Sequence, residues 1–291
     1  MLSQNGKIIY ARFPTRDKLS VPKGFVKESG IETPTAEDIV RMDRARKGKK
    51  LSNEDWVSKS DPEAKIARMK DGTTHLAYKP EHAVDLDTGA VVAAELHPAD
   101  EGDTTTLGKT LAAAGARLEA VDLGPTPEAP AECVTDKGYH SRAVLKALDD
   151  GPWKTRIAAP KGKGFARWNG DEAARRAVTN NRNRLLSGVA REAFKLRAEV
   201  VERGFAHVPD RGGVRRTWLR GRDNVHKRYL LHVAGHNLGL LMRQLIGAGT
   251  PKGAVAGGKR LIVFVALPDG SILALLAPTG TNHAVLVAIF V

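Results

Sequence analysis

Two carboxylates, Asp136 and Glu202, stand where a folded chain could use them for chemistry. Asp136 follows a short apolar run, Glu132–Thr135, and begins the turn sequence Asp-Lys-Gly. This pattern places it at the C-terminal end of a buried strand, the edge at which open α/β sheets bind ligands. The alternative is an ordinary turn residue. For an isolated Asp-x-Gly that alternative is the better one, because Asp and Gly are common in turns.

Glu202 belongs to a stretch, residues 171–208, whose composition predicts helix with a break near Ser187–Gly188. At about 100° per residue, one apolar stripe is formed by Phe194, Ala198, Val201, Phe205 and Val208. Glu202 lies roughly 80° from the middle of that stripe, and Glu199 roughly 140°. We therefore expect Glu202 at the edge where the helix meets a sheet and Glu199 in solvent. A surface charge beside a core stripe is the alternative for Glu202.

The elements that must position these carboxylates follow an α/β order. Two β-rich runs around a Gly-containing turn predict a hairpin over residues 73–98. A helix over residues 103–118 follows, and then the strand before Asp136. After a helix at Arg142–Leu148, residues 155–159 predict one more strand. Hairpin, helix, strand, helix and strand in this order predict a mixed β-sheet flanked by helices.

Capping residues support three of the predicted helices. Thr35 followed by Asp38 resembles a capping box and predicts a short helix over residues 36–46. Asp103 or Thr104 is expected to cap the helix after the hairpin, and Ser141 the helix after Asp136.

The composition favours a polyanionic partner. Lys and Arg number 46 against 33 Asp and Glu, so the net charge is +13, which favours nucleic acid over a membrane surface. The single cysteine, Cys133, excludes an internal disulfide and fits a reducing cytoplasm, with a role as core filler. Neither a signal peptide nor a clean membrane span is visible. Aromatic residues are only 5%, which argues against a single-stranded RNA platform.

A basic segment, defined here as residues 211–228, gathers cations that suit phosphate, because a guanidinium donates two parallel hydrogen bonds. The predicted DNA-binding residues are Arg211, Arg215, Arg216, Arg220, Arg222, Lys227 and Arg228. Trp218 stands among them. It is expected either to stack on a base or, equally, to anchor the loop to the core.

Several segments, in this order, resemble the DDE transposases of bacterial insertion sequences: GIETPTAEDIVRMDRARKGKKLSNEDWV (30–57), HAVDLDTGAVVAAELHPADEGDTTTL (82–107), VTDKGYHSRAVL (134–145) and VVERGFAHVPDRGGVRRTWLRGRDNVHKRYLLHVAGHNLGLLMR (200–243). The resemblance covers roughly residues 25–250. It implies a ribonuclease-H-like fold and metal-dependent DNA strand cleavage and transfer at the ends of a mobile element.

The resemblance also assigns roles to both carboxylates. The family's second Asp lies in the DKGYHS motif, which is Asp136 here, and its Glu lies in the VERxFAH motif, which is Glu202. With a third carboxylate they hold two divalent metal ions, Mg²⁺ or Mn²⁺. The chemistry agrees, since phosphodiester attack uses two cations about 4 Å apart and hard carboxylate oxygens suit Mg²⁺.

The sequence departs from the family at the first catalytic Asp, which should lie on a strand upstream of GIETPT. Residues 1–24 contain nothing like that motif. We therefore expect a sheet incomplete at its first strand, and a truncated copy defective in strand transfer. Asp85, placed in the hairpin strand, is the best substitute carboxylate. The alternative for Asp85 is an ordinary residue on the polar face of a strand. Asp87 is interpreted as a turn residue.

Three domains are predicted: a polar and basic segment over residues 1–60, a DDE catalytic domain over 61–250 and an apolar, β-prone tail over 251–291. The expected partner is double-stranded DNA at the inverted repeats of the element, in the cytoplasm and away from membranes. A homo-oligomer is compatible with this assignment. The alternative function is a non-catalytic DNA-binding remnant of a transposase.

Overall fold

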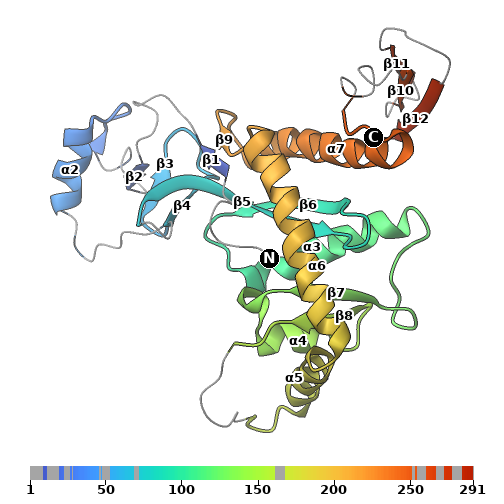
Figure 1. Cartoon of the computed structure of the whole chain (residues 1–291). Coiled ribbons are helices and arrows are strands. Elements are labelled where there is room, and N and C mark those ends of the chain that lie inside the picture. The colour runs from blue at the N-terminus through green and yellow to red at the C-terminus, as the bar shows by residue number, and fades with distance from the viewer. Residues whose placement is uncertain are drawn as a thin grey trace. The chain divides into compact units, whose positions relative to one another are not determined.

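The computed structural model describes most of the chain (Figure 1), namely residues 9–11, 20–22, 27, 29–45, 47, 53–68, 72–160, 168–250, 253, 260–266, 272–276 and 284–290. Contacts between residues divide the chain into two compact units, Met1–His232 and Val233–Val291. The boundary falls inside one long helix, α7 (Arg222–Ile246). The predicted three-domain boundaries stay a prediction.

The first unit alternates strands and helices. Its strands are β1 (Ile9–Ala11), β2 (Ser20–Pro22), β3 (Trp56–Ser58), β4 (Lys65–Arg68), β5 (Thr74–Val84), β6 (Val91–Pro98), β7 (Ala131–Thr135), β8 (Trp153–Ile157) and β9 (Arg216–Thr217). Its helices are α2 (Ala36–Ala45), α3 (Asp103–Glu119), the 3-10 turn η2 (Lys137–Tyr139), α4 (Arg142–Leu148), α5 (Glu172–Leu185), α6 (Gly188–Phe205), the π-helical turn η3 (Ala206–Arg211) and the first part of α7. This confirms a mixed α/β fold.

Strand β5 is the centre of the main sheet. It pairs antiparallel with β6 along one edge, and the predicted hairpin is confirmed, with a bulge between Ala83 and Val84. On the opposite edge it pairs with β1 at Ala77 and Tyr78, and β1 pairs parallel with β9. The parallel pair β7–β8 forms a sheet of its own. Among the described residues no pairing joins β5 to β7, so a single ribonuclease-H-like sheet stays a prediction.

Helices cover these strands on several sides (Figure 1). Helix α3 packs on β5 and β6, α5 packs on α4 and β8, and α6 packs on β7 and β5. One core lies between α3, β7, β8, α4 and α5, and its buried residues are Leu107, Leu111, Cys133, Tyr139, Leu145, Ile157 and Ala177. Burial, with the nearby charge of Glu81, raises the pKa of the Cys133 thiol to about 12. The thiol therefore stays protonated and acts as a small core side chain, as predicted.

The outer edge of β8 is closed by a side chain of α5. Asn181 is buried, its Oδ1 accepts a hydrogen bond from the Ile157 amide at 2.9 Å, and its Nδ2 donates to the Ile157 carbonyl at 2.9 Å. The amide group thus satisfies both backbone groups that a neighbouring strand would otherwise bind.

Local capping signals set several helix starts. Thr35 and Asp38 exchange the hydrogen bonds of a capping box at α2, and Ser141 Oγ accepts from the Val144 amide at 3.1 Å at α4. Both predictions are confirmed. The predicted cap of α3 is wrong: Gly102 occupies the N-cap without a side-chain hydrogen bond. Asp103 lies in the first turn instead, because its carboxylate pairs with Lys79.

The second unit continues α7 into a small β-sheet. Strand β10 (Arg260–Ala266) pairs antiparallel with β11 (Ile272–Leu276) and parallel with β12 (Ala284–Phe290). The β-prone character predicted for the tail is confirmed in its described residues. None of the helices in the described part of the chain is both long and apolar enough to cross a membrane.

Candidate functional site

Asp136 lies directly after β7, at the strand end where the sequence placed it, and it also begins the turn that follows. Its backbone is extended, and its Oδ1 accepts a hydrogen bond from the Gly138 amide at 2.8 Å, which holds the turn η2. Its Oδ2 lies 3.9 Å from Nη2 of Arg197 on α6. The side chain is only 16% exposed. Asp136 is thus a turn residue whose second oxygen faces a buried cation.

Arg197 is a site residue that the sequence reasoning missed. Its side chain is 6% exposed, and burial lowers the pKa of its guanidinium, while Asp136, Tyr139 and Glu202 act in the opposite direction. A signal existed: Arg197 lies one turn before Val201 on the stripe that faces the sheet, so a charge interrupts that stripe. A buried charge is normally paired with an opposite charge, and a carboxylate at the end of a strand can be that partner.

Glu202 is exposed on α6, next to the buried Val201. Its charge acts on the guanidinium of Arg197, the partner of Asp136. Within the described part of the chain, no hydrogen bond or ion pair joins Glu202 to Asp136. Glu199 lies in solvent as predicted and pairs with Arg203 one turn later.

Asp85 does not occupy a strand, so that placement is wrong. Strand β5 ends at Val84, and the Asp85 carboxylate accepts hydrogen bonds from the amides of Asp87 and Thr88 and from the Thr88 hydroxyl. The Asp85 amide also donates to the Ala90 carbonyl at 2.9 Å. An Asp that accepts from the following amides stabilises a turn, and this local bonding ends the strand early. Both of its carboxylate oxygens have partners inside the turn.

Asp103, at the start of α3, brings a second carboxylate to the Asp136 turn. A Cβ on Gly138 would lie 2.6 Å from Asp103 Oδ2 and 3.0 Å from Asp136 Oδ1, so both carboxylates press on this residue. A larger residue fits here only if one of the two carboxylates shifts. The other oxygen, Oδ1, accepts from Lys79 Nζ at 2.7 Å, and this pair is largely buried. Sequence reasoning placed Asp103 as a cap, since its partner lies on another element.

Glu81, on β5, is the most deeply buried acid of this region. Its carboxylate accepts hydrogen bonds from the Tyr139 hydroxyl at 2.5 Å, from the Thr110 hydroxyl at 2.6 Å and from His97 Nε2 at 3.1 Å. Burial would raise the pKa of Glu81, but the bonds from His97, Thr110 and Tyr139 outweigh it and lower the pKa from its ordinary value. Glu81 therefore anchors Tyr139, three residues after Asp136. We call Glu81, Asp103, Asp136, Lys79 and Arg197 the carboxylate site.

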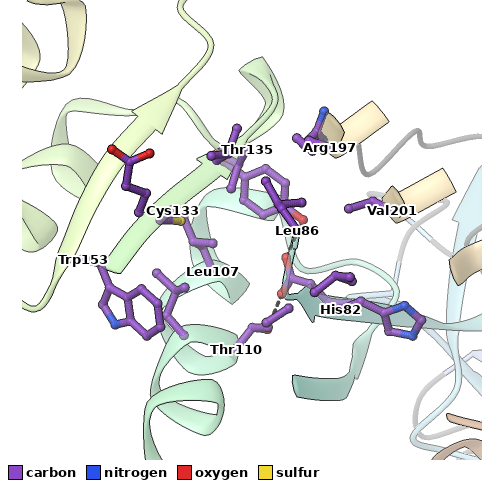
Figure 2. A pocket seen from close by; sticks show the side chains of 16 residues that line it. His82, Leu86, Leu107, Thr110, Cys133, Thr135, Trp153, Arg197 and Val201 are labelled. Carbon is purple, nitrogen blue, oxygen red and sulfur yellow. Dashed lines mark hydrogen bonds between the residues drawn. The ribbon is translucent and has the colours of Figure 1, made fainter. Parts of the chain in front are cut away.

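A cavity of about 120 Å³ lies beside this site, lined by β5, α3, β7 and α6. Figure 2 shows Arg197 and Val201 entering from α6 on one side and Trp153 on the other. Glu81 on β5 and Thr135 at the end of β7 also line the cavity, so it lies between these two strands.

The donors around Asp136 do not complete a two-metal site. In the described ranges, no group of three or more His, Cys, Asp or Glu side chains is placed to hold a metal ion. One oxygen of Asp136 is bound by the Gly138 amide, and the other faces Arg197. A fixed positive charge beside a carboxylate opposes the binding of a divalent cation there. The roles of Asp136, Glu202 and Asp85 in binding metal stay predictions.

The predicted DNA-binding residues gather around β9 and the start of α7. Five of them are exposed: Arg211, Arg216, Arg220, Arg222 and Lys227. Arg215 is half-buried, and its Nε lies 2.9 Å from Asp210 Oδ1. The guanidinium of Arg228 stacks on the indole of Trp218, 4.2 Å from the ring centroid. Contact of these residues with DNA stays a prediction.

A known protein family matches most of the sequence. The family model described as the transposase DDE domain matches residues 32–238, more than half of the chain. Neither a curated protein nor a solved structure matches the sequence. The match spans the carboxylate site and the basic segment together.

Proposed function

Because the chain belongs to the transposase DDE domain family, we propose that it binds double-stranded DNA at the inverted-repeat ends of an insertion sequence and is defective in strand cleavage and transfer. The fold we propose is ribonuclease-H-like. DNA binding is supported by the five exposed cations of the basic segment and by the net charge of +13.

The defect is supported by one observation, the position of Arg197. Its guanidinium faces the Asp136 oxygen that a metal ion would need, at 3.9 Å, and it is buried with that carboxylate. The guanidinium of Arg197 thus neutralises the charge of the Asp136 carboxylate, which a metal ion would otherwise do. The pair thereby satisfies Asp136 structurally, as a buried carboxylate requires.

An active enzyme is the second candidate, and Asp103 favours it. This carboxylate meets the Asp136 turn at Gly138, so two acids already stand close together at the end of β7. In that case Asp136 and Glu202 would hold Mg²⁺ or Mn²⁺, and the ion would supply Lewis-acid chemistry.

Labelled duplexes from the two ends of the element separate the candidates. We expect the logarithm of the association constant to fall linearly as the logarithm of the salt concentration rises. The slope should be about −0.9 for each phosphate contacted. With Mg²⁺ or Mn²⁺ present, we expect no cleavage above that of the Asp136→Asn variant. Glu199→Gln is the matched control for Glu202→Gln, because Glu199 lies on the same helix and points into solvent.

Each other outcome is decisive. Metal-dependent cleavage that Asp136→Asn and Glu202→Gln abolish and Glu199→Gln preserves would establish the active enzyme and overturn the defect. Cleavage that none of the three variants alters would contradict the assigned site. If the unmodified protein fails to bind these duplexes at low salt, both candidates are wrong.

A further inference from the structure

Trp218 is an exposed aromatic side chain in the middle of the basic segment. It is 65% exposed, so it does not anchor its loop to the core. The guanidinium of Arg228 lies over its ring, 4.2 Å from the centroid. Because Arg228 covers one side of the ring and Trp218 as a whole is still 65% exposed, the opposite face of the ring is open to solvent.

The loop that carries Trp218 is fixed on its N-terminal side. Thr217 is 1% exposed and belongs to β9, which pairs with β1. Its hydroxyl accepts a hydrogen bond from the Leu219 amide at 3.1 Å, across Trp218. The backbone of Trp218 is therefore held between two bonded neighbours.

The C-terminal side is fixed as well. The amide of Gly221 donates to Asp61 Oδ2 at 3.2 Å, and the amide of Arg222 donates to Glu63 Oε2 at 2.9 Å. Asp61 is itself 1% exposed and accepts from the Tyr78 hydroxyl at 2.6 Å, on β5. The indole is thus displayed by a preorganised loop, so little conformational entropy is lost when something stacks on it.

Arg228 is positioned by the helix that bears it. On α7 the next residue, Tyr229, is fully buried, and its hydroxyl lies 2.6 Å from Nε2 of His82 on β5. The Arg228 carbonyl accepts from His232 Nδ1 at 2.8 Å. One guanidinium nitrogen, Nη1, is buried and has no hydrogen-bond acceptor in the described part of the chain. The stacking on Trp218 is one contact that holds this guanidinium.

Exposed cations stand close to Trp218 and Arg228 in the sequence. Arg216 and Arg220 stand two residues before and after Trp218, and both are exposed, as is Lys227 beside Arg228. An open aromatic face among exposed cations is the combination that binds single-stranded nucleic acid, since bases stack on the ring while phosphates contact the cations.

We propose that Trp218 and Arg228 form a stacking platform for an unpaired DNA base. A paired base inside a duplex hides both of its faces in the helical stack, so the platform fits only a base at an unpaired end or in an opened step. The proposal rests on the proposed function for its partner, DNA, and adds which part of that DNA the basic segment reads.

The chain supplies its own control. Arg142 lies over Trp168 in a second arginine–tryptophan pair, 4.6 Å from the ring centroid, but Trp168 is half-buried. Replacing Trp168 removes the same chemical pair at a place that offers less open ring. Trp218 is exposed, so its replacement leaves the core intact.

The test uses the full chain in EDTA with two DNA probes, a blunt duplex and the same duplex with a short 3′ thymidine overhang. We expect Trp218→Ala to weaken binding of the overhang probe by about 5- to 100-fold and to change blunt-duplex binding by less than about 2-fold. Trp218→Phe should retain part of the preference, and Trp168→Ala all of it. Overhang DNA should quench a fluorescence component that Trp218→Phe lacks.

Two results would overturn the platform: equal loss of affinity for both probes in Trp218→Ala, or an overhang preference that survives this change with the fold intact by circular dichroism. The proposed function fails separately. If the unmodified protein binds the overhang through Trp218 but never the blunt duplex, the platform stands and the proposed function does not.

Discussion

The carboxylate site and the basic segment lie in the same unit and treat charge in opposite ways. In the carboxylate site the acids are enclosed and matched, with Asp103 on Lys79 and Asp136 on Arg197. In the basic segment five cations are exposed. Buried, matched charges contribute to one fixed structure, whereas exposed charges of one sign act on partners outside the molecule. The difference separates an exposed basic surface from an enclosed acidic centre whose charges are matched.

The largest effect on stability is expected when Glu81 is replaced. In Glu81→Ala the donors of His97, Thr110 and Tyr139 are left without their buried acceptor, so we expect a loss of about 3–5 kcal/mol in the free energy of unfolding. Urea denaturation followed by circular dichroism measures it. Glu95 is the matched control, since it pairs across the hairpin with Glu81 but carries a partly exposed ion pair to Arg117. Its replacement by Ala should cost less than about 1 kcal/mol.

Next in size is the effect of removing exposed cations. We expect the triple variant Arg216→Ala, Arg220→Ala and Arg222→Ala to bind duplex DNA about 10- to 100-fold more weakly near 0.1 M salt, with a salt slope smaller by about 3. Its control replaces three arginines that pair with acids elsewhere: Arg117, Arg175 and Arg176. Equal losses in both triple variants would mean that net charge alone drives binding, and the comparison between the two regions would fail.

A smaller effect is expected at the close contact between Asp103 and Asp136. Gly138→Ala places a methyl group 2.6 Å from Asp103 Oδ2, and we expect a loss of about 1–3 kcal/mol in the free energy of unfolding. In an Asp103→Ala background the same change should cost less, because one of the two crowding carboxylates is gone. Thermal melts of the four proteins complete the cycle. An identical cost in both backgrounds would show that Asp103 does not press on this turn.

The smallest effect is expected on acidification. The pKa of Glu81 is lower in the folded protein than in the unfolded chain. Its ionised form therefore adds stability above the ordinary glutamate pKa, and this part is lost as the pH falls through the lowered value. The difference in melting temperature between the unmodified protein and Glu81→Gln should shrink between about pH 5 and pH 3. A difference that grows in this range would reverse the sign of the argument.

Local signals made much of the fold predictable. The Thr35–Asp38 box and the Ser141 cap act within three residues, and the hairpin alternation acts between neighbours in sequence. The prediction that Asp85 lies in a strand failed for a local reason as well, because its carboxylate accepts a hydrogen bond from the turn that follows it. Pattern alone does not separate the last strand residue from the first turn residue.

The centre of the carboxylate site was not predictable because its partners are distant in sequence. Lys79 and Asp103 are 24 residues apart, and Glu81 and Tyr139 are 58 apart. The sequence periodicity of the elements that carry these residues does not predict such contacts. Arg197 could have been noticed in the sequence, because it is a charge on the apolar stripe of its helix. Its partner at the end of β7 is defined only by the packing of α6 on that strand.

The contact between Asn181 and Ile157 has a consequence for how this protein behaves at high concentration. A two-stranded parallel sheet has two open edges, and an open edge recruits strands from other molecules. At β8 the side-chain amide occupies the backbone groups of Ile157 from the outside, so another copy cannot extend the sheet there. One polar side chain on α5 thereby limits intermolecular aggregation along that side.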